Sequence, residues 1–190
     1  MATSPIAPSV PQVEEEMVED LYRITSKAEL INGKVVRMSP TGFLAGRGGG
    51  IIFASLLDHE RTRGGGYAFP DNVGFVVNLP RRKSFSPDAA FYVGQPTGMK
   101  FLTGAPVFAV EVRSENDYGP RAAKAIARKI ADYFAAGTLV VWDVDMLGPD
   151  VVKSCRASDP DDPLVFRRGE VAHAEPAVPG WRLPVDDLFS

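Results

Sequence analysis

The sequence predicts an α/β protein in which helices flank a central mixed sheet. An apolar segment at residues 107–113 is followed by a helical pattern at 120–136, which begins with Pro, and then by the apolar segment 139–144. Strand, helix and strand in this order predict a parallel crossover unit. A second sign is the alternation of apolar and polar residues over 29–38 around Asn32-Gly33, because this dipeptide tolerates positive φ and favours a β-hairpin.

Two further helices and several short strands complete the predicted secondary structure. Apolar residues recur at helical spacing in two segments, and short β-branched or aromatic runs lie between Pro, Gly and Ser residues. The glycines at positions 46 and 48–50 lack the Gly-Lys-Ser/Thr ending of a phosphate-binding loop, so a flexible connection is expected there. The expected elements are helices at 13–25 and about 50–61, central-sheet strands at 73–79 and 88–93, and strands at 151–152 and 164–166 around a polar turn at 159–163.

The length and composition are typical of one globular domain. The chain has 190 residues, of which 45% are apolar and 24% are charged, and such a chain can form a hydrophobic core without disulfides or metals. Residues 1–12 are rich in Pro, Ser and Ala without a period and predict a flexible N-terminal arm. The domain is therefore expected to span residues 13–190.

The cysteine and histidine content excludes two kinds of structural site and favours a reducing compartment. Cys155 is the single cysteine, and His59 and His173 lie far apart, so neither a disulfide framework nor a Cys/His zinc site is expected.

No basic start precedes an apolar core and no run of about 18 apolar residues occurs, so we expect a cytoplasmic protein without membrane contact. The net charge of -3 gives no general attraction to nucleic acid, so phosphate binding would need local basic clusters or metal ions.

Two carboxylates stand out in the predicted strands. Asp88 opens a strand after Ser86-Pro87, and Glu111 interrupts the apolar run at 107–113. Burial of an unpaired carboxylate is unfavourable by several kcal/mol, so Glu111 needs a cation or a strong partner. Two such acids on adjacent strands suit Mg²⁺, with Mn²⁺ also possible, because these ions take oxygen ligands. The alternatives are that Asp88 caps a backbone N–H and that Glu111 forms a buried ion pair, and Asp71 is interpreted as a turn residue.

Two basic residues are candidates to act beside these carboxylates. Arg113 shares a strand face with Glu111, and its guanidinium stays protonated, so it suits a phosphate contact or an ion pair rather than a base. Lys129 lies at the edge of the apolar stripe of the third predicted helix and can point toward the sheet. Partial burial would lower the pKa of Lys129 and aid proton transfer. Either residue could be the ion-pair partner of Glu111, and Tyr133 is expected to be a core aromatic.

Several short segments occur in an order that carries a family resemblance. They are Ala-Glu-Leu-Ile-Asn-Gly-Lys-Val-Val at 28–36, Met-Ser-Pro at 38–40, Ser-Pro-Asp at 86–88, Val-Glu-Val-Arg-Ser at 110–114, Lys129-x-x-x-Tyr133 with Gly137, and Trp-Asp-Val at 142–144. Together these segments resemble the Uma family of bacterial restriction endonucleases, within the PD-(D/E)XK nuclease superfamily. Family members commonly have a histidine shortly after the Met-Ser-Pro segment, whereas residues 41–48 contain none.

The resemblance implies a restriction-endonuclease-like fold, with a mixed central sheet, flanking helices, and an N-terminal helix and hairpin. It also implies Mg²⁺-dependent hydrolysis of phosphodiester bonds, in which Glu29, Asp88, Glu111 and Lys129 match the catalytic positions. By this resemblance Asp88 and Glu111 would hold the metal, and the lysine would act from the helix instead of the strand. The leading hypothesis is therefore a metal-dependent endonuclease with DNA as its substrate.

Other functions and a dimeric state stay open at this point. The first alternative is a non-catalytic binding or scaffold protein that keeps the nuclease fold, and a further one is hydrolysis of another phosphate ester at the same carboxylates. Arg81-Arg82-Lys83, with Arg61 and Arg63, could contact phosphates or form a solvated loop. A homodimer is expected because strand edges and the apolar tail at 181–189 can associate, and two sites would suit cutting a DNA duplex.

Overall fold

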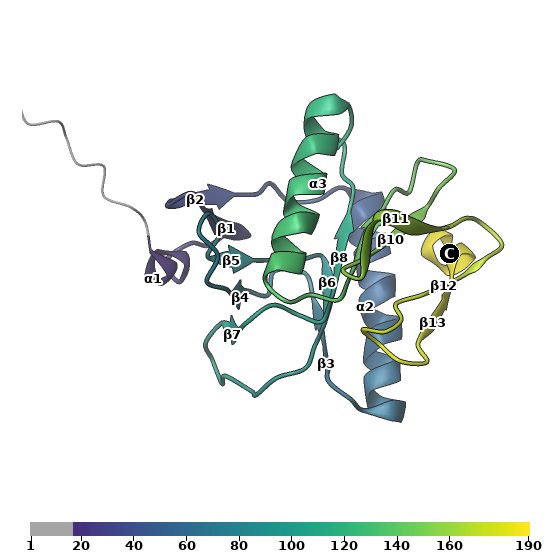
Figure 1. The fold of residues 1–190 in the computed structure, drawn as a ribbon, viewed down its shortest axis with the longest axis horizontal. Coiled ribbons are helices and arrows are strands. Elements are labelled where there is room, and N and C mark those ends of the chain that lie inside the picture. Colours follow the sequence, from purple (N-terminus) through teal and green to yellow (C-terminus); the bar gives the residue numbers. More distant parts are fainter. Residues whose placement is uncertain (1–16) are drawn as a thin grey trace, which may run out of the picture.

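A six-stranded mixed sheet lies at the centre of the computed structural model, which describes residues 17–190 (Figure 1). Its strands follow the order β11-β10-β9-β8-β6-β3. They are β3 (Tyr67–Pro70), β6 (Ala89–Tyr92), β8 (Phe108–Val112), β9 (Val140–Val144), β10 (Val152–Arg156) and β11 (Asp159–Phe166). The expected arm at 1–12 and the start of the first expected helix at 13–16 lie outside the described residues.

Strands β8 and β9 are parallel neighbours joined by helix α3 (Pro120–Ala135), which confirms the predicted crossover unit. Pro120 suits the first turn of the helix because the N–H that proline lacks has no helical partner there, and Gly137 (φ 102°) follows the helix end. The other neighbouring pairs of this sheet are antiparallel. The register pairs Glu111 with Asp143, so these two side chains lie on the same face of the sheet.

Helix α2 (Phe43–Arg63) covers the face of the sheet opposite to α3. It begins well before residue 50, so the flexible connection expected at the glycines is wrong. A Cβ on Gly49 would lie 3.4 Å from the backbone oxygen of Asp88, and one on Gly48 would lie 3.3 Å from Sδ of Met146. Close packing against the sheet therefore outweighs the weak helix propensity of glycine. Neither α2 nor any other helix of residues 17–190 is both long and apolar enough to cross a membrane.

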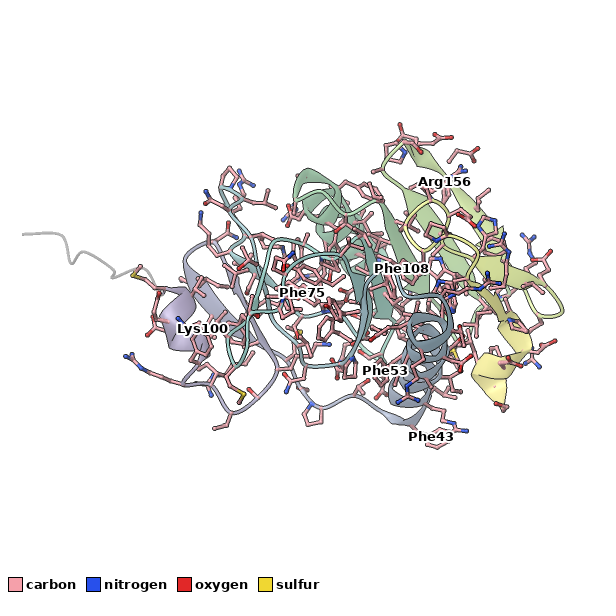
Figure 2. The ribbon with its side chains drawn as sticks, turned by 90° about the horizontal axis from the view of Figure 1, so that it is seen from below. Phe43, Phe53, Phe75, Lys100, Phe108 and Arg156 are labelled. Carbon is pink, nitrogen blue, oxygen red and sulfur yellow. The ribbon has the colours of Figure 1, made fainter. Side chains whose placement is uncertain are left out.

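Two hydrophobic cores lie on the two faces of the sheet. The larger core joins Ile52 and Leu56 of α2 to Phe108 and its neighbours in the sheet. The smaller core contains Phe75 and Tyr133 and lies on the side of α3. Figure 2 labels one residue of each core, Phe108 and Phe75, at separate places in the molecule. The sheet is thus buried on both faces, which fits its apolar strands.

The C-terminal segment completes the larger core. It contains β12 (Val171–His173), β13 (Arg182–Pro184) and the 3₁₀ helix η1 (Val185–Phe189), and it lies beside α2 (Figure 1). Trp181 and Leu188 are only 2% and 1% exposed, and the indole N–H of Trp181 donates to Oγ of Ser55 at 3.0 Å. The expectation of an available apolar tail at 181–189 is therefore wrong, because this segment is part of the core.

The N-terminal hairpin forms as predicted. Strands β1 (Ala28–Ile31) and β2 (Lys34–Arg37) are joined by Asn32 (φ 52°) and Gly33 (φ 67°). The hairpin attaches to strand β5 (Ser84–Phe85), since the N–H of Leu30 donates to Oγ of Ser84 at 2.8 Å. This contact brings β1, and with it Glu29, toward the central sheet.

Three local predictions differ from the structure. Helix α1 (Val18–Leu21) ends before the expected boundary at residue 25. The segment 73–79 contributes β4 (Phe75–Val76) to a small sheet of order β5-β4-β7, completed by β7 (Leu102–Thr103), and not to the central sheet. The polar turn expected at 159–163 belongs to β11, whose edge position tolerates its prolines because one side of an edge strand makes no ladder hydrogen bonds.

Candidate functional site

Two of the four predicted catalytic residues, Glu29 and Glu111, contact a third, Lys129. Glu29 comes from β1, Glu111 from β8 and Lys129 from α3. The Nζ atom of Lys129 lies 2.8 Å from Oε2 of Glu111 and 3.0 Å from Oε1 of Glu29. The fourth residue, Asp88, lies immediately before β6, and its negative charge acts on Glu111. The fold therefore brings the predicted residues to one place.

Glu111 faces α3 and has two partners there. Besides the ammonium of Lys129, the hydroxyl of Tyr133 donates to Oε1 of Glu111 at 2.7 Å. Burial raises the pKa of Glu111, and the nearby carboxylates of Asp88 and Glu29 raise it further, whereas Lys129 acts in the opposite direction. Tyr133 is a core aromatic, as predicted, but its contact with Glu111 was missed although it lies one turn after Lys129 on the same helix face.

Glu29 is more completely paired than Glu111. Its side chain is buried, its Oε1 accepts a hydrogen bond from the N–H of Ser86 at 3.0 Å, and its Oε2 pairs with Arg82. Burial opposes ionisation, but Lys129 and Arg82 outweigh it and lower the pKa of Glu29. Arg82 is itself buried, and its Nε donates to Oδ2 of Asp132 at 2.9 Å. The interpretation of Arg82 as a phosphate contact or a solvated loop residue is therefore wrong.

Asp88 is held by a backbone amide and by a lysine that was not among the predicted site residues. The N–H of Val112 donates to Oδ2 of Asp88 at 2.7 Å, and Nζ of Lys27 lies 2.6 Å from Oδ1. The same Nζ lies 2.6 Å from Oδ1 of Asp71, which also accepts from the N–H of Asn72 as a turn residue does. Lys27 lies just before β1 and shows no local sequence signal for this role.

The predicted lowering of the Lys129 pKa is wrong. Burial does act to lower it, but Glu111 and Glu29 both favour the charged ammonium, and the net shift raises the pKa of Lys129. The ammonium therefore stays protonated. Lys129 can neutralise and orient the carboxylates or donate to a phosphate oxygen, but it does not suit the role of a base.

Arg113 forms an ion pair with a residue other than Glu111. Its guanidinium binds Asp143 through two parallel hydrogen bonds, at 2.7 Å from Nε and 2.6 Å from the second nitrogen. Its closest further carboxylate is Asp145, at 3.8 Å. The alternative that pairs Arg113 with Glu111 is therefore wrong, and a phosphate would have to compete with Asp143 for this guanidinium.

A hollow of about 150 Å³ opens beside Asp88. Phe53 of α2, labelled in Figure 2, is one of its apolar walls, and Asp71 and Asp88 supply its carboxylates. Its remaining lining is Thr41, Ala45, Gly46, Gly49, Gly50 and Pro70. The hollow gives small ions and water a route to Asp88 from the side of α2.

The donor chemistry of the site fits a divalent cation, although no preformed cage exists. Within residues 17–190, no three His, Cys, Asp or Glu side chains are grouped so that they could hold a metal ion. The ion pairs around the site nevertheless join five carboxylates to three cations, which leaves an excess of negative charge. This charged cluster consists of Asp71, Asp88, Glu111, Glu29 and Asp132 with Lys27, Lys129 and Arg82. Mg²⁺ and Mn²⁺ prefer such oxygen donors and often use only one or two protein carboxylates.

The central mixed sheet, its flanking helices and the N-terminal hairpin define a mixed α/β protein. A family model named Uma2 and described as "Putative restriction endonuclease" matches residues 16–186, and the chain belongs to this family. The fold is also similar to the crystal structure of a nuclease, described as putative and belonging to DUF820, from Anabaena variabilis ATCC 29413. That likeness has a TM-score of 0.69 and 15% sequence identity, and it covers 90% of this chain and 96% of the other, so it shows the fold alone. A search of curated proteins found no match.

Proposed function

We propose that this protein is a metal-dependent endonuclease that hydrolyses phosphodiester bonds in DNA, with Asp88 and Glu111 as the ligands of Mg²⁺ or Mn²⁺. The observation that carries the proposal is the partly buried carboxylate of Glu111, whose pKa is raised by burial and by the negative charges of Asp88 and Glu29 although Lys129 pairs with it. A divalent ion would relieve this repulsion. Membership of the Uma2 family supports the same reaction class.

The chain's own residues would orient the two metal ligands. The N–H of Val112 fixes Oδ2 of Asp88 and leaves Oδ1 for a cation. The hydroxyl of Tyr133 and the ammonium of Lys129 fix the two oxygens of Glu111. When bound, a divalent ion supplies Lewis acidity toward water and the oxygens of a phosphodiester. Hydrogen bonds to metal-ligating carboxylates of this kind increase both metal affinity and activity.

The protons of Lys129 and Tyr133 stay in place in this mechanism. The pKa of Tyr133 is raised, first by burial and then by the negative charges of Glu111 and Glu29, and that of Lys129 is raised by the same carboxylates. Lys129 therefore acts as a fixed positive charge that can stabilise charge developing on the phosphate. Glu29 positions Lys129 by pairing with its ammonium, and Arg82 in turn pairs with Glu29.

A second candidate is a non-catalytic protein that keeps the nuclease fold. One observation favours it, namely that each proposed metal ligand already has a lysine partner, Lys27 for Asp88 and Lys129 for Glu111. Carboxylates paired with lysines in this way could persist for stability alone. Under this alternative the protein could still bind DNA, but divalent ions would not make it cut DNA.

A cleavage assay with matched variants tests the proposal. Supercoiled plasmid is incubated with wild-type protein, Asp88→Asn and Asp150→Asn in Mg²⁺, in Mn²⁺ and in EDTA. Asp150 is a suitable control because it pairs with Arg167 away from the charged cluster. Nicking by the wild type and the control, with a loss of at least about 100-fold in Asp88→Asn and in EDTA, is expected. Binding of DNA without cleavage in either metal would favour the second candidate.

The proposal also includes a homodimer, because two sites are needed to cut both strands of a duplex in one complex. The C-terminal segment is not available as its interface, since Trp181 and Leu188 are buried. Sedimentation equilibrium of the protein with and without a DNA duplex measures the oligomeric state directly. A monomer under both conditions would restrict the proposal to nicking of single strands.

A further inference from the structure

Lys27 is a partly buried cation that neither the family resemblance nor the proposed mechanism uses. Its side chain is 15% exposed, and its Nζ lies 2.6 Å from Oδ1 of Asp71 and 2.6 Å from Oδ1 of Asp88. These contacts join the segment before β1 to a residue 61 positions further along the chain. The ammonium therefore lies at one of the oxygens that a metal ion would use.

We propose that Lys27 is an internal counter-cation that occupies the cation position at Asp88 in the metal-free protein and that a divalent metal ion displaces it. This inference rests on the proposed function, because it concerns access of the metal to Asp88. It assigns Lys27 the role of a positioning residue that sets the metal affinity of the site. It also assigns Asp71 the role of the partner that holds the displaced ammonium.

The geometry of Asp88 makes this exchange a direct competition. One carboxylate oxygen, Oδ2, accepts the N–H of Val112 at 2.7 Å, and this bond fixes the orientation of the carboxylate. The other oxygen, Oδ1, is the one that Lys27 contacts. A metal ion bound to the same oxygen would lie close to the ammonium, and the repulsion between the two positive charges favours the presence of only one of them.

The charges around Asp88 explain why a cation stays at this position when no metal is bound. The negative charges of Asp88 and Glu29 both act on the carboxylate of Glu111, and like charges repel each other. Lys27 offsets part of this repulsion, because it interacts favourably with both Asp88 and Glu111. Without Lys27 or a metal, the carboxylates would be insufficiently neutralised.

Asp71 gives the displaced ammonium a second partner. The side chain of Asp71 is 47% exposed, and Asp71 and Asp88 both line the hollow beside α2. An ion can therefore reach Asp88 through the hollow while Lys27 remains paired with Asp71. The lysine does not have to become an unpaired buried charge during the exchange.

Binding of Mn²⁺ to the full chain, measured by electron paramagnetic resonance, tests the inference without using activity. The variants are Lys27→Met, Lys27→Gln, Asp71→Asn and the double variant Lys27→Met/Asp71→Asn, with Lys34→Met as the control because Lys34 is exposed on β2. Both Lys27 variants are expected to bind Mn²⁺ at least about tenfold more tightly than the wild type, because a competing charge is gone. Asp71→Asn is expected to weaken binding in the wild type and to have little effect when Lys27 is replaced.

Several outcomes would overturn the inference. Equal or weaker Mn²⁺ binding by both Lys27 variants would do so, and the proposed function would stand if Asp88→Asn still abolished binding. Failure of both Lys27 variants to fold in saturating Mn²⁺ would also overturn it, because the ion is expected to replace the ammonium. Absence of Mn²⁺ binding from the wild type and from every variant would overturn the inference and the proposed function together.

Discussion

Glu29 and Glu111 share the ammonium of Lys129, yet their pKa values are shifted in opposite directions. Nζ of Lys129 is 3.0 Å from Oε1 of Glu29 and 2.8 Å from Oε2 of Glu111. Burial acts against ionisation of both, but Arg82 helps Lys129 to lower the pKa of Glu29, whereas Asp88 and Glu29 add to burial and raise the pKa of Glu111. The cluster therefore favours the ionised form of Glu29 and disfavours the ionised form of Glu111.

The same substitution at these two positions is expected to change stability in opposite directions. At pH 7, Glu29→Gln should lower the free energy of unfolding by roughly 3 kcal/mol, because it leaves Arg82 and Lys129 without a full partner in a buried place. Glu111→Gln should leave it unchanged or raise it, because the substitution removes a negative charge that burial and the neighbouring carboxylates disfavour. Urea denaturation followed by circular dichroism measures both values, and each variant is the control for the other.

The pH dependence of these two variants follows from the directions of the shifts. Because the pKa of Glu29 is lowered, its ionised form stabilises the protein above its ordinary pKa of 4.5, and the stability is lost as the pH falls through the folded value. Because the pKa of Glu111 is raised, the stability that its protonated form gives the folded protein is fully present below pH 4.5. That stability is lost as the pH rises through the folded pKa and Glu111 ionises. The advantage of Glu111→Gln over the wild type should therefore vanish below about pH 4.5. An advantage that is constant from pH 4 to 8 would contradict this account.

Replacement of Lys129 tests the cation that the two glutamates share. Lys129→Met should lower the free energy of unfolding by roughly 3 kcal/mol at pH 7, because Glu111 then lacks a counter-charge. The loss should be smaller at pH 5, where Glu111 with its raised pKa takes up a proton more readily. Lys124→Met is the matched control, since Lys124 is exposed on the same helix. Equal effects of the two substitutions would show that Lys129 is not a buried partner.

The ion pair between Arg113 and Asp143 leads to a prediction about structure and not about phosphate binding. Arg113→Ala should reduce the free energy of unfolding by up to roughly 3 kcal/mol, because the carboxylate of Asp143 is left buried and unpaired. Affinity for Mn²⁺ should change less than about twofold, since Arg113 contacts neither Asp88 nor Glu111. Thermal denaturation and Mn²⁺ titration of the same samples separate the two effects. A weaker DNA affinity with unchanged stability would instead assign Arg113 to phosphate binding.

The glycines of α2 offer a test of the helix itself. A Cβ on Gly50 would have nothing within 4 Å, so Gly50→Ala should raise the free energy of unfolding by about 0.5–1 kcal/mol through the better helix propensity of alanine. Gly49→Ala should gain less, because its Cβ would lie 3.4 Å from the backbone oxygen of Asp88. Thermal melting of the two variants compares them directly. A loss of stability in Gly50→Ala would mean that this segment is not helical.

The sequence alone could predict those parts of the fold and site that have local signals. The crossover of β8, α3 and β9 follows from apolar periodicity and from Pro120 and Gly137 at the ends of the helix. Glu111 interrupts an apolar strand, and Lys129 lies at the edge of an apolar helix stripe, so the hydrophobic pattern around each residue is enough to mark it as unusual. These are cases in which the neighbours in sequence are also the neighbours that decide the structure.

The remaining site residues depend on contacts between distant parts of the chain. Lys27 meets Asp88 across 61 positions, and Arg82 meets Glu29 across 53, so no local pattern indicates either pair. The pKa of Lys129 was predicted in the wrong direction because the prediction weighed burial alone, whereas the charges of Glu111 and Glu29 outweigh burial in the folded protein. The start of α2 was missed because Gly48 and Gly49 pack closely against residues outside the helix, which outweighs their weak helix propensity.

Calorimetric titration of Mn²⁺ into wild-type protein, Asp88→Asn and Asp150→Asn tests the central claim most directly. The asparagine keeps an oxygen that can accept the N–H of Val112, so the variant removes charge with little change in shape. The account predicts one saturable site in the wild type and in Asp150→Asn, and a loss of at least about tenfold in affinity in Asp88→Asn. Binding of equal strength in Asp88→Asn, or no binding in the wild type, would contradict a metal centre at Asp88 and Glu111.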